Sequence, residues 1–286
     1  MVIIATIRHS RYNIGHMKKK SFGLALGSGG VKGLAHVGVI ACLVKNGLIP
    51  DYIAGTSIGS WVGAHFALYQ DVEKLTEFTV GKRKEKLYSL VEPSLSGGVV
   101  RGKKVEALLK EWLNNATFED LKIPFCAAAT DLITGGPMVF STGYIVPALR
   151  ASMSIPTMFQ PVVMDGRVLV DGGISNPVPV SVAKSMGADV VLAVNLDSYE
   201  HNNAFTDKDA TRIGKVMGRS LDVMRRYLAL AATKDANITI SPQMPAGEVD
   251  IWKSYFMNKL GQELVDSGYA ETEKIIPELK KLLGRK

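Results

Sequence analysis

Cysteine and histidine are scarce in this chain of 286 residues. It contains two cysteines, Cys42 and Cys126, each within an apolar run, and five histidines. Two isolated cysteines exclude a disulfide framework and favour a reducing compartment, so we expect a cytoplasmic location, with the membrane periphery as the alternative. The histidines form no HExxH or HxxxH pair and no cluster with cysteine, so we expect no metal and no other cofactor.

Long apolar segments and blocks of like charge are also missing. The longest charge-free stretch, residues 52–70, approaches the ~20 residues of a membrane span, but three glycines and several polar residues interrupt it, which predicts a buried segment. Lys and Arg number 34 against 27 Asp and Glu, a formal net charge of +7 without any run of five like charges. This balance permits contact with an anionic membrane surface and does not indicate nucleic acid. It leaves the oligomeric state open.

The composition is that of a folded protein with a sizeable core, because 47% of the residues are hydrophobic and 21% charged. Residues 1–20 are interpreted as an N-terminal extension. It is either a wrongly assigned start, since Met17 is a second methionine just before the first predicted strand, or a disordered segment. The apolar run at residues 2–7 is too short for a signal peptide. We expect a catalytic core at 21–196, completed within the same domain by a strand and helices at 197–286.

Strand and helix patterns alternate along the chain. Apolar runs predict strands near residues 22–27, 52–54, 123–132, 137–142, 188–196 and 236–242, and helices near 34–44, 61–68, 103–113, 147–156 and 263–283. Asp165-Gly166 between two apolar runs predicts a hairpin. Residues 71–101 are charged and then rich in Gly and Ser, which suggests a lid. The alternation predicts an α/β fold with a central, mostly parallel sheet sandwiched by helices, a three-layer architecture related to the α/β-hydrolases.

The sequence Gly55-Thr56-Ser57-Ile58-Gly59 matches G-x-S-x-G between a strand and a helix, the context of a nucleophile elbow. The sharp turn would hold Ser57 in a strained conformation, and side chains at Gly55 or Gly59 would collide there. A helix-capping serine in a turn of small residues is the alternative interpretation of this motif.

A serine nucleophile needs a base, and no histidine is placed to supply one. The last histidine, His201, lies in a polar segment, whereas His36 and His65 fall within helices where packing or a backbone hydrogen bond explains them. Asp171, followed by Gly172 and Gly173 at the end of an apolar strand, offers a carboxylate instead. Its reference pKa of ~3.9 is low for a base, so burial would have to raise it. An aspartate serving only its turn is the alternative.

A third element is the glycine-rich turn before the first helix. Successive small residues there would leave backbone N–H groups pointing into a concavity, which binds anions. The residues are Gly27, Ser28, Gly29, Gly30, Val31, Lys32 and Gly33. The absence of Gly-Lys-Ser/Thr makes a nucleotide loop a poor match, so an oxyanion hole is favoured. Lys32 would either add positive charge or be an exposed lysine at the helix start.

Four blocks in this order resemble the bacterial patatin-like phospholipases: GSGGVKGLAHVGVI, AGTSIGS, RASMSIPTMFQPV and VDGG, within residues 22–196. The resemblance implies a serine/aspartate dyad that hydrolyses lipid esters without histidine or metal. Ser57 matches the nucleophile, Asp171 the base, and Gly29, Gly30 and Val31 the oxyanion donors. The acid block reads DGG where many members have DGA, and residues 197–286 resemble the family only loosely.

We therefore expect an acyl hydrolase that acts on phospholipids or related lipids through an acyl-enzyme. A thioesterase or general esterase is the alternative among enzymes, and a regulatory protein that binds an acyl lipid without catalysis is the alternative from another class. Near the C-terminus, RIGKVMGRSLDVMRRYL combines basic residues with a Met/Leu stripe. This segment predicts either a helix on a membrane surface or, in preference, a helix packed on the domain with its basic face in solvent.

Overall fold

A computed structural model describes residues 19–81, 85, 88, 92–93, 100–197, 205–243 and 260–285. The expectations for residues 1–18 and for His201 therefore lie outside the described residues, as does much of the lid segment. The described start of that segment is α3, a surface helix over Val72–Thr79 whose side chains at Leu75 and Thr79 are buried.

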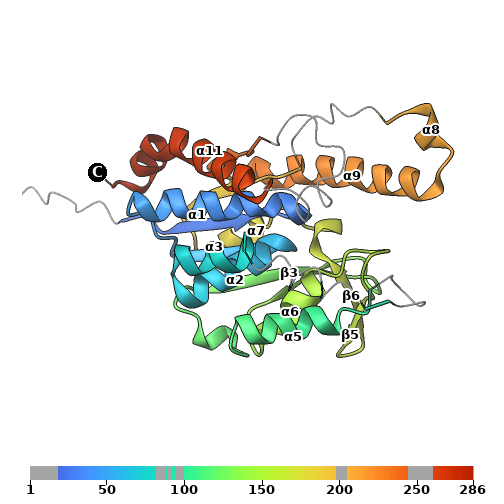
Figure 1. Cartoon of the computed structure of the whole chain (residues 1–286). Coiled ribbons are helices and arrows are strands. Elements are labelled where there is room, and N and C mark those ends of the chain that lie inside the picture. Colours follow the sequence, from blue (N-terminus) through green and yellow to red (C-terminus); the bar gives the residue numbers. More distant parts are fainter. Residues whose placement is uncertain are drawn as a thin grey trace, which may run out of the picture.

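An eight-stranded mixed sheet forms the centre of the protein (Figure 1), in the order β5-β6-β3-β2-β1-β7-β8, with β4 paired to β3 outside this path. Strands β1, β2, β3, β7 and β8 are parallel, whereas β4, β5 and β6 extend the sheet through antiparallel pairs. The strand bounds are β1 Phe22–Leu26, β2 Tyr52–Thr56, β3 Phe125–Asp131, β4 Pro137–Phe140, β5 Val162–Met164, β6 Arg167–Asp171, β7 Val190–Val194 and β8 Ile238–Ile240.

Helices cover both faces of this sheet, which confirms the predicted α/β class and its three layers. The α-helices are α1 Ala35–Lys45, α2 Ile58–Tyr69, α3 Val72–Thr79, α5 Lys103–Trp112, α6 Ile145–Ser152, α7 Val180–Ser185, α8 Asp207–Ala210, α9 Ile213–Ala232 and α11 Leu260–Leu283. Short 3₁₀ helices are η1 Gly30–Leu34, η2 Phe118–Asp120, η3 Gly172–Ile174 and η4 Thr233–Asp235.

The sequence of β1 explains how the two faces differ. Successive side chains of a strand point to opposite faces. Phe22, Leu24 and Leu26 are buried in the large core against α1, α2 and α11. Ala25 belongs to a smaller core of mostly alanine and valine beneath α7. At Gly23 a β-carbon would lie 2.6 Å from the Ala188 β-carbon, so this side of β1 has room only for small residues.

The predicted hairpin is present and determines where Asp171 lies. Asp165 and Gly166 have φ angles of 50° and 72°, as a primed turn requires, and join β5 to β6. Strand β6 then pairs antiparallel with β3, which aligns Asp171 with Ala129. The sheet pairing thus brings the end of β6 next to the carboxyl end of the parallel strands.

Helix α9 differs from the preferred expectation of a packed helix. In Figure 1 it extends from the sheet towards α8, and Ala229 is its one buried residue, although all of its residues are described. The contact of α9 with the core is made by its C-terminal half, through Ala229. Much of the apolar side of the helix is exposed as a result. In the described part of the chain no helix combines the length and apolar character that crossing a bilayer requires.

Candidate active site

Ser57 occupies the turn between β2 and α2 in a backbone conformation that non-glycine residues rarely adopt, with φ 55° and ψ −125°. The flanking glycines are required by close backbone packing. A β-carbon at Gly59 would lie 2.2 Å from the carbonyl oxygen of Leu26, and one at Gly55 would lie 2.5 Å from that of Gly59. The turn therefore has the strand–turn–helix geometry of a nucleophile elbow.

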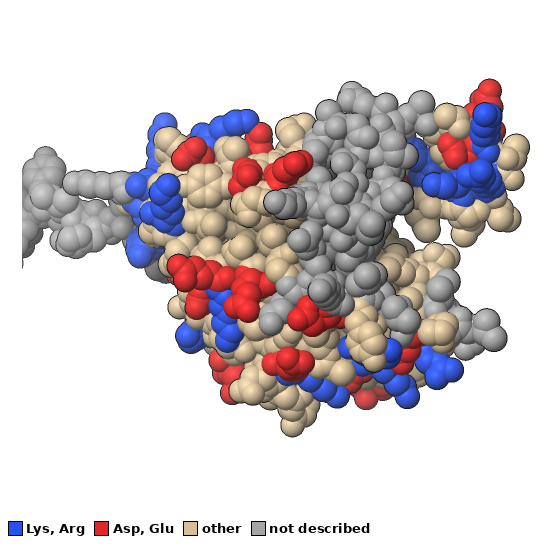
Figure 2. Space-filling model, viewed as in Figure 1, with Lys and Arg blue, Asp and Glu red and all other residues tan. Residues whose placement is uncertain are grey.

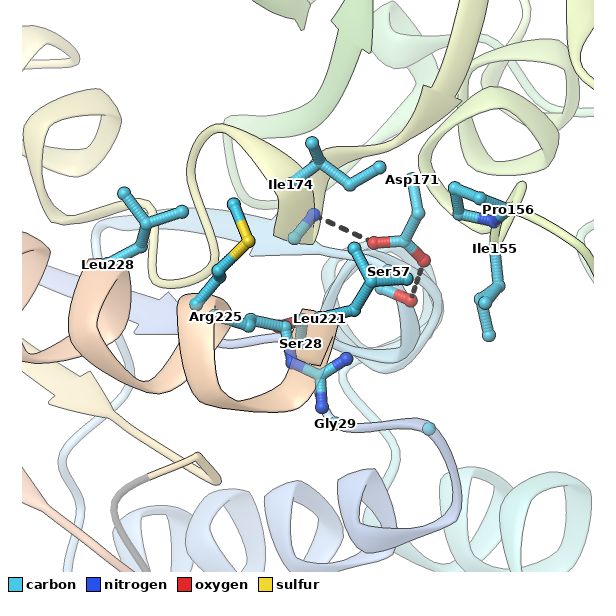
Figure 3. A pocket seen from close by; sticks show the side chains of 13 residues that line it. Ser28, Gly29, Ser57, Ile155, Pro156, Asp171, Ile174, Leu221, Arg225 and Leu228 are labelled. Carbon is cyan, nitrogen blue, oxygen red and sulfur yellow. Dashed lines mark hydrogen bonds between the residues drawn. The ribbon is translucent and has the colours of Figure 1, made fainter. Parts of the chain in front are cut away.

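The structure brings Ser57 and Asp171 together, although 114 positions separate them in the sequence. The Ser57 hydroxyl donates a hydrogen bond of 2.5 Å to Oδ2 of Asp171, and both side chains are buried. Figure 3 shows this bond and the second hydrogen bond to the carboxylate, in which the Gly173 N–H donates to Oδ1 over 2.7 Å. The two oxygens of Asp171 thus have separate partners.

The pKa of Asp171 is raised from 3.8 to about 6, and burial is the main cause. The hydrogen bonds from Ser57 and Gly173 oppose this shift because they favour the charged carboxylate, as does the positive charge of Arg225. A pKa near 6 leaves Asp171 mostly ionised at neutral pH and still a better base than a solvated carboxylate.

The glycine-rich turn lies beside the dyad. Gly29 and Gly30 line the same cavity as Ser57 and Asp171. The backbone after Gly29 winds into η1, and the first N–H groups of a helix have no partner within it. Val31 is buried and is not among the residues that line the cavity, so its role as an oxyanion donor stays a prediction.

Lys32 is placed differently from both expectations. It is neither exposed nor directed into the cavity, but buried, with Nζ donating to the Leu196 carbonyl at 2.9 Å and to Asp197 at 3.1 Å. Asp197 also accepts hydrogen bonds from the guanidinium of Arg225, at 2.8 and 3.1 Å, and from the Ser28 hydroxyl. Lys32 therefore anchors the glycine-rich turn to the segment that follows β7.

The remaining supporting glycines have steric roles. A β-carbon at Gly33 would lie 2.2 Å from the side chain of Ile58, and one at Gly27 would lie 2.6 Å from the Val194 carbonyl oxygen. Gly172 likewise faces the Ala128 carbonyl oxygen at 2.2 Å. These contacts let the turn, the elbow and the end of β6 approach one another closely.

Sequence reasoning missed Ser152, Asp197 and Arg225 as parts of the site. The Ser57 N–H donates to the Ser152 hydroxyl at 2.9 Å, and that hydroxyl donates to the Ala128 carbonyl at 2.6 Å. The signal for Ser152 was its place in the third block of the family resemblance, which begins RASMSIP, but nothing local indicated its partner. Asp197 follows β7 by three residues and reads as an ordinary turn acid.

The described histidines are not bases for Ser57. His36 donates from Nε2 to the Gly27 carbonyl at 2.8 Å, and His65 packs its ring against Tyr69 and Phe78. Burial lowers the pKa of each to about 4. Both are therefore neutral parts of the packing, as expected. Among the described residues, no three His, Cys, Asp or Glu side chains are grouped so that they could bind a metal ion.

Apolar side chains surround the dyad in a cavity of about 100 Å³. Ile155 and Pro156 line one side, Ile174 adjoins Asp171, and α9 contributes Leu221, Met224, Arg225 and Leu228. Figure 3 shows Leu228 and Pro156 on opposite sides of the dyad. The apolar part of this lining can accept an aliphatic group, and the polar side chains that line the cavity are those of Ser28, Ser57, Asp171 and Arg225.

Comparison with known proteins decides the family. Residues 24–184, more than half of the chain, match the family model described as Patatin-like phospholipase. This chain belongs to the patatin-like phospholipase family. The match contains both members of the dyad and the glycine-rich turn, so the resemblance expected from the four blocks is confirmed.

Relatives of this patatin-like chain include proteins named for lipid hydrolysis. An uncharacterized NTE family protein of Mycobacterium tuberculosis is 36% identical over 178 residues, which cover 62% of this chain and 49% of the relative. Lysophospholipase nte1 of Aspergillus fumigatus is 33% identical over 189 residues, covering 64% of this chain and 12% of that protein. The chain thus spans at most about half the length of these relatives.

The fold is shared with VipD of Legionella pneumophila, a solved structure. It superimposes with a TM-score of 0.61 at 12% sequence identity, covering 91% of this chain and 67% of VipD. This similarity includes residues beyond the family match and shows the fold alone.

Proposed function

We propose that this patatin-like protein is a lipid acyl hydrolase that works through a Ser57–Asp171 dyad. The hydrogen bond between the two side chains, 2.5 Å long in a buried site, carries the proposal. Family membership and the apolar cavity support a lipid ester as substrate, because an acyl chain needs apolar contacts beside the nucleophile.

In the first half of the reaction, Asp171 accepts the Ser57 proton as Oγ attacks the ester carbonyl carbon. The carbonyl oxygen becomes an oxyanion, which the N–H groups of Gly29, Gly30 and Val31 stabilise. The tetrahedral intermediate then expels the alcohol, which takes the proton from Asp171, and leaves an acyl-enzyme.

In the second half, water replaces the alcohol. Asp171 accepts a proton from the water as its oxygen attacks the acyl carbonyl, and the same N–H groups stabilise the second oxyanion. Ser57 leaves with the proton held by Asp171, which releases a fatty acid and restores the dyad.

The test compares Ser57→Ala and Asp171→Asn with the wild-type chain. We expect a fluorophosphonate probe to label the wild type and not Ser57→Ala, and Asp171→Asn to reduce kcat by at least about 10²–10⁴-fold. Asp165→Asn is the matched control, since Asp165 is exposed in the hairpin turn six residues earlier. Near wild-type turnover by Asp171→Asn, or loss of activity with a chelator and its return with a divalent ion, would contradict the mechanism.

The substrate class is tested with the same proteins. Turnover of phospholipid vesicles is compared with turnover of soluble short esters and thioesters. A preference for phospholipid supports the proposal, a preference for soluble esters or thioesters supports the esterase alternative, and intact folding without probe labelling or turnover supports a binding protein.

A further inference from the structure

Helix α9 presents an apolar face that no described part of the protein covers. Nine of its large apolar side chains are exposed, among them Ile213 at 84%, Met224 at 60% and Tyr227 at 69%. The others are Val216, Met217, Leu221, Val223, Leu228 and Leu230. A contiguous apolar face of this kind on a soluble domain indicates an interaction site.

Charge and apolar residues are segregated around α9. Ile213, Met217, Met224 and Leu228 recur at spacings of four and seven residues, which places them on one side of the helix. The helix carries Lys215, Arg219, Arg225 and Arg226 against a single acid, Asp222. Arg225 is held by Asp197 and Asp222. Lys215 is exposed, whereas Arg219 and Arg226 are partly exposed, and their spacing places all three on the side away from the apolar face. Figure 2 shows both Lys/Arg and Asp/Glu at the end of the molecule formed by α8 and the start of α9, the acids there belonging to α8.

The same apolar face continues into the candidate active site. Leu221, Met224 and Leu228 are partly exposed and also line the cavity that contains Ser57. Figure 3 shows Leu221 and Leu228 extending from α9 beside the dyad. Ile174, 37% exposed, continues the apolar rim beyond Asp171. A surface that covers α9 would therefore also meet the opening of the cavity.

We propose that α9 docks this protein on an anionic lipid surface, with its apolar side inserted at the headgroup boundary and its basic residues close to the lipid phosphates. An amphipathic helix with basic polar residues has the chemistry that this surface recognises. Docking places the cavity opening against the bilayer, where an acyl ester can enter without crossing water. The choice of a lipid surface as the partner of α9 rests on the proposed function.

A second copy of the chain suits this face less well. Pairing α9 with its own copy through a two-fold axis would bring the same basic residues near one another with one acid per helix to offset them. It would also cover the cavity opening. An anionic surface instead offers counter-charges to Lys215 and Arg219, so charge complementarity favours the lipid.

Vesicle flotation tests this docking in the full chain carrying Ser57→Ala, so that no lipid is consumed. We expect binding to phosphatidylcholine vesicles containing phosphatidylserine, and much weaker binding to phosphatidylcholine alone or at high salt. Ile213→Glu or Met217→Glu should weaken binding by about tenfold or more. Lys215→Gln should weaken it about fivefold.

Matched controls place the same changes away from α9. Ile49→Glu alters an exposed isoleucine before β2, at the end of the sheet opposite Ser57, and Lys281→Gln alters an exposed lysine near the end of α11. Both should bind vesicles like the parent chain. Circular dichroism and thermal unfolding establish that every variant is folded.

Three outcomes decide whether α9 binds a lipid surface, a second copy of the chain, or neither. Binding that the α9 variants lose and the controls keep supports the proposal. Equal binding by all variants overturns it. A dimer in sedimentation that Ile213→Glu converts to a monomer, without vesicle binding, overturns it in favour of a second copy.

The proposed function is tested separately, by measuring ester turnover with variants that retain Ser57. Ile213→Glu and Met217→Glu lie outside the cavity lining, so their turnover of a soluble short ester should equal wild type while vesicle turnover falls. Vesicle binding without any ester turnover would refute the hydrolase and leave the docking surface standing.

Discussion

The carboxyl group of Asp171 is buried and accepts two hydrogen bonds, the features on which its proposed role as a base depends. Burial raises its pKa to about 6, and the hydrogen bonds from Ser57 and Gly173 limit that rise. The Ser57 hydroxyl donates to Oδ2, and the Gly173 N–H donates to Oδ1, so both carboxylate oxygens are fixed in position. Asp171 therefore needs no second side chain to orient it, in contrast to a histidine in a triad.

The first prediction at this scale is a pH dependence of ester hydrolysis. Activity requires the ionised Asp171, so kcat/KM for a soluble ester should rise with an apparent pKa near 6 and level off above pH 7. A pH–rate profile from pH 4 to 8 measures this. Asp165→Asn should show the same profile, and a flat profile down to pH 4 would exclude Asp171 as the base.

The second prediction concerns stability. The pKa of Asp171 is higher in the folded protein than its ordinary 3.8, so stability falls as pH rises from about 3.8 to about 6. The loss is complete above about 6, where both states are ionised, and absent below about 3.8, where both are protonated. Asp171→Asn removes this effect. The variant should be more stable than wild type at pH 8, by about 3 kcal/mol, with the difference vanishing near pH 4. Denaturant unfolding at the two pH values measures it, and an unchanged difference would contradict the linkage.

At the scale of elements, the position of Ser57 depends on how closely β1, β2 and α2 pack. The start of α2 lies against the backbone of β1, with no space for a side chain at Gly59. The Ser57 N–H is held by Ser152 at the end of α6, and the Ser60 hydroxyl donates to the Ser57 carbonyl at 2.6 Å. The strained turn is thus held from three sides.

The third prediction tests that packing. Gly59→Ala would place a β-carbon 2.2 Å from the Leu26 carbonyl oxygen, so α2 must move away from β1. We expect a loss of about 3 kcal/mol in the free energy of unfolding and a fall in kcat. Gly136→Ala is the control, because its β-carbon would meet only the Thr134 side chain, at 3.7 Å, and should change stability by under about 0.5 kcal/mol. Denaturant unfolding compares them, and equal stabilities would show that α2 accommodates the methyl group.

At the scale of the whole molecule, Asp197 connects parts of the chain that are far apart in sequence. From the end of β7 it accepts hydrogen bonds from Ser28 and Lys32 of the glycine-rich turn and from Arg225 of α9. Burial acts to raise the pKa of Asp197, but the charges of Lys32 and Arg225 lower it overall. This cluster joins the candidate oxyanion loop to the proposed docking helix.

The fourth prediction is that Asp197→Asn destabilises the protein strongly. It leaves Lys32 and Arg225 without their shared counter-charge in a buried setting, which costs on the order of 3–5 kcal/mol. Glu106→Gln removes an acid from the exposed pair with Lys110 and should cost under about 1 kcal/mol. Urea unfolding of both variants checks this, and a loss as small as that of Glu106→Gln would refute the role of the cluster.

The sequence by itself determined the local features. Alternating and continuous apolar runs placed the strands within a few residues, and Asp165-Gly166 located the hairpin, because these patterns arise from neighbouring residues. The G-x-S-x-G and DGG motifs predicted Ser57 and Asp171 as the candidate nucleophile and base in the same way. Their steric requirements are local, since a sharp turn needs glycine next to it whatever the rest of the fold does.

Only the tertiary structure decided what depends on distant partners. The pairing of β6 with β3 brings Asp171 to Ser57, and burial raises the pKa of Asp171. The cluster around Asp197 explains Lys32, for which the sequence left open either added positive charge at the turn or an exposed lysine. The exposed apolar face of α9 belongs here too. A helical stripe has the same pattern whether it packs on a core or is exposed, and only the structure shows that the large apolar side chains of α9 are exposed.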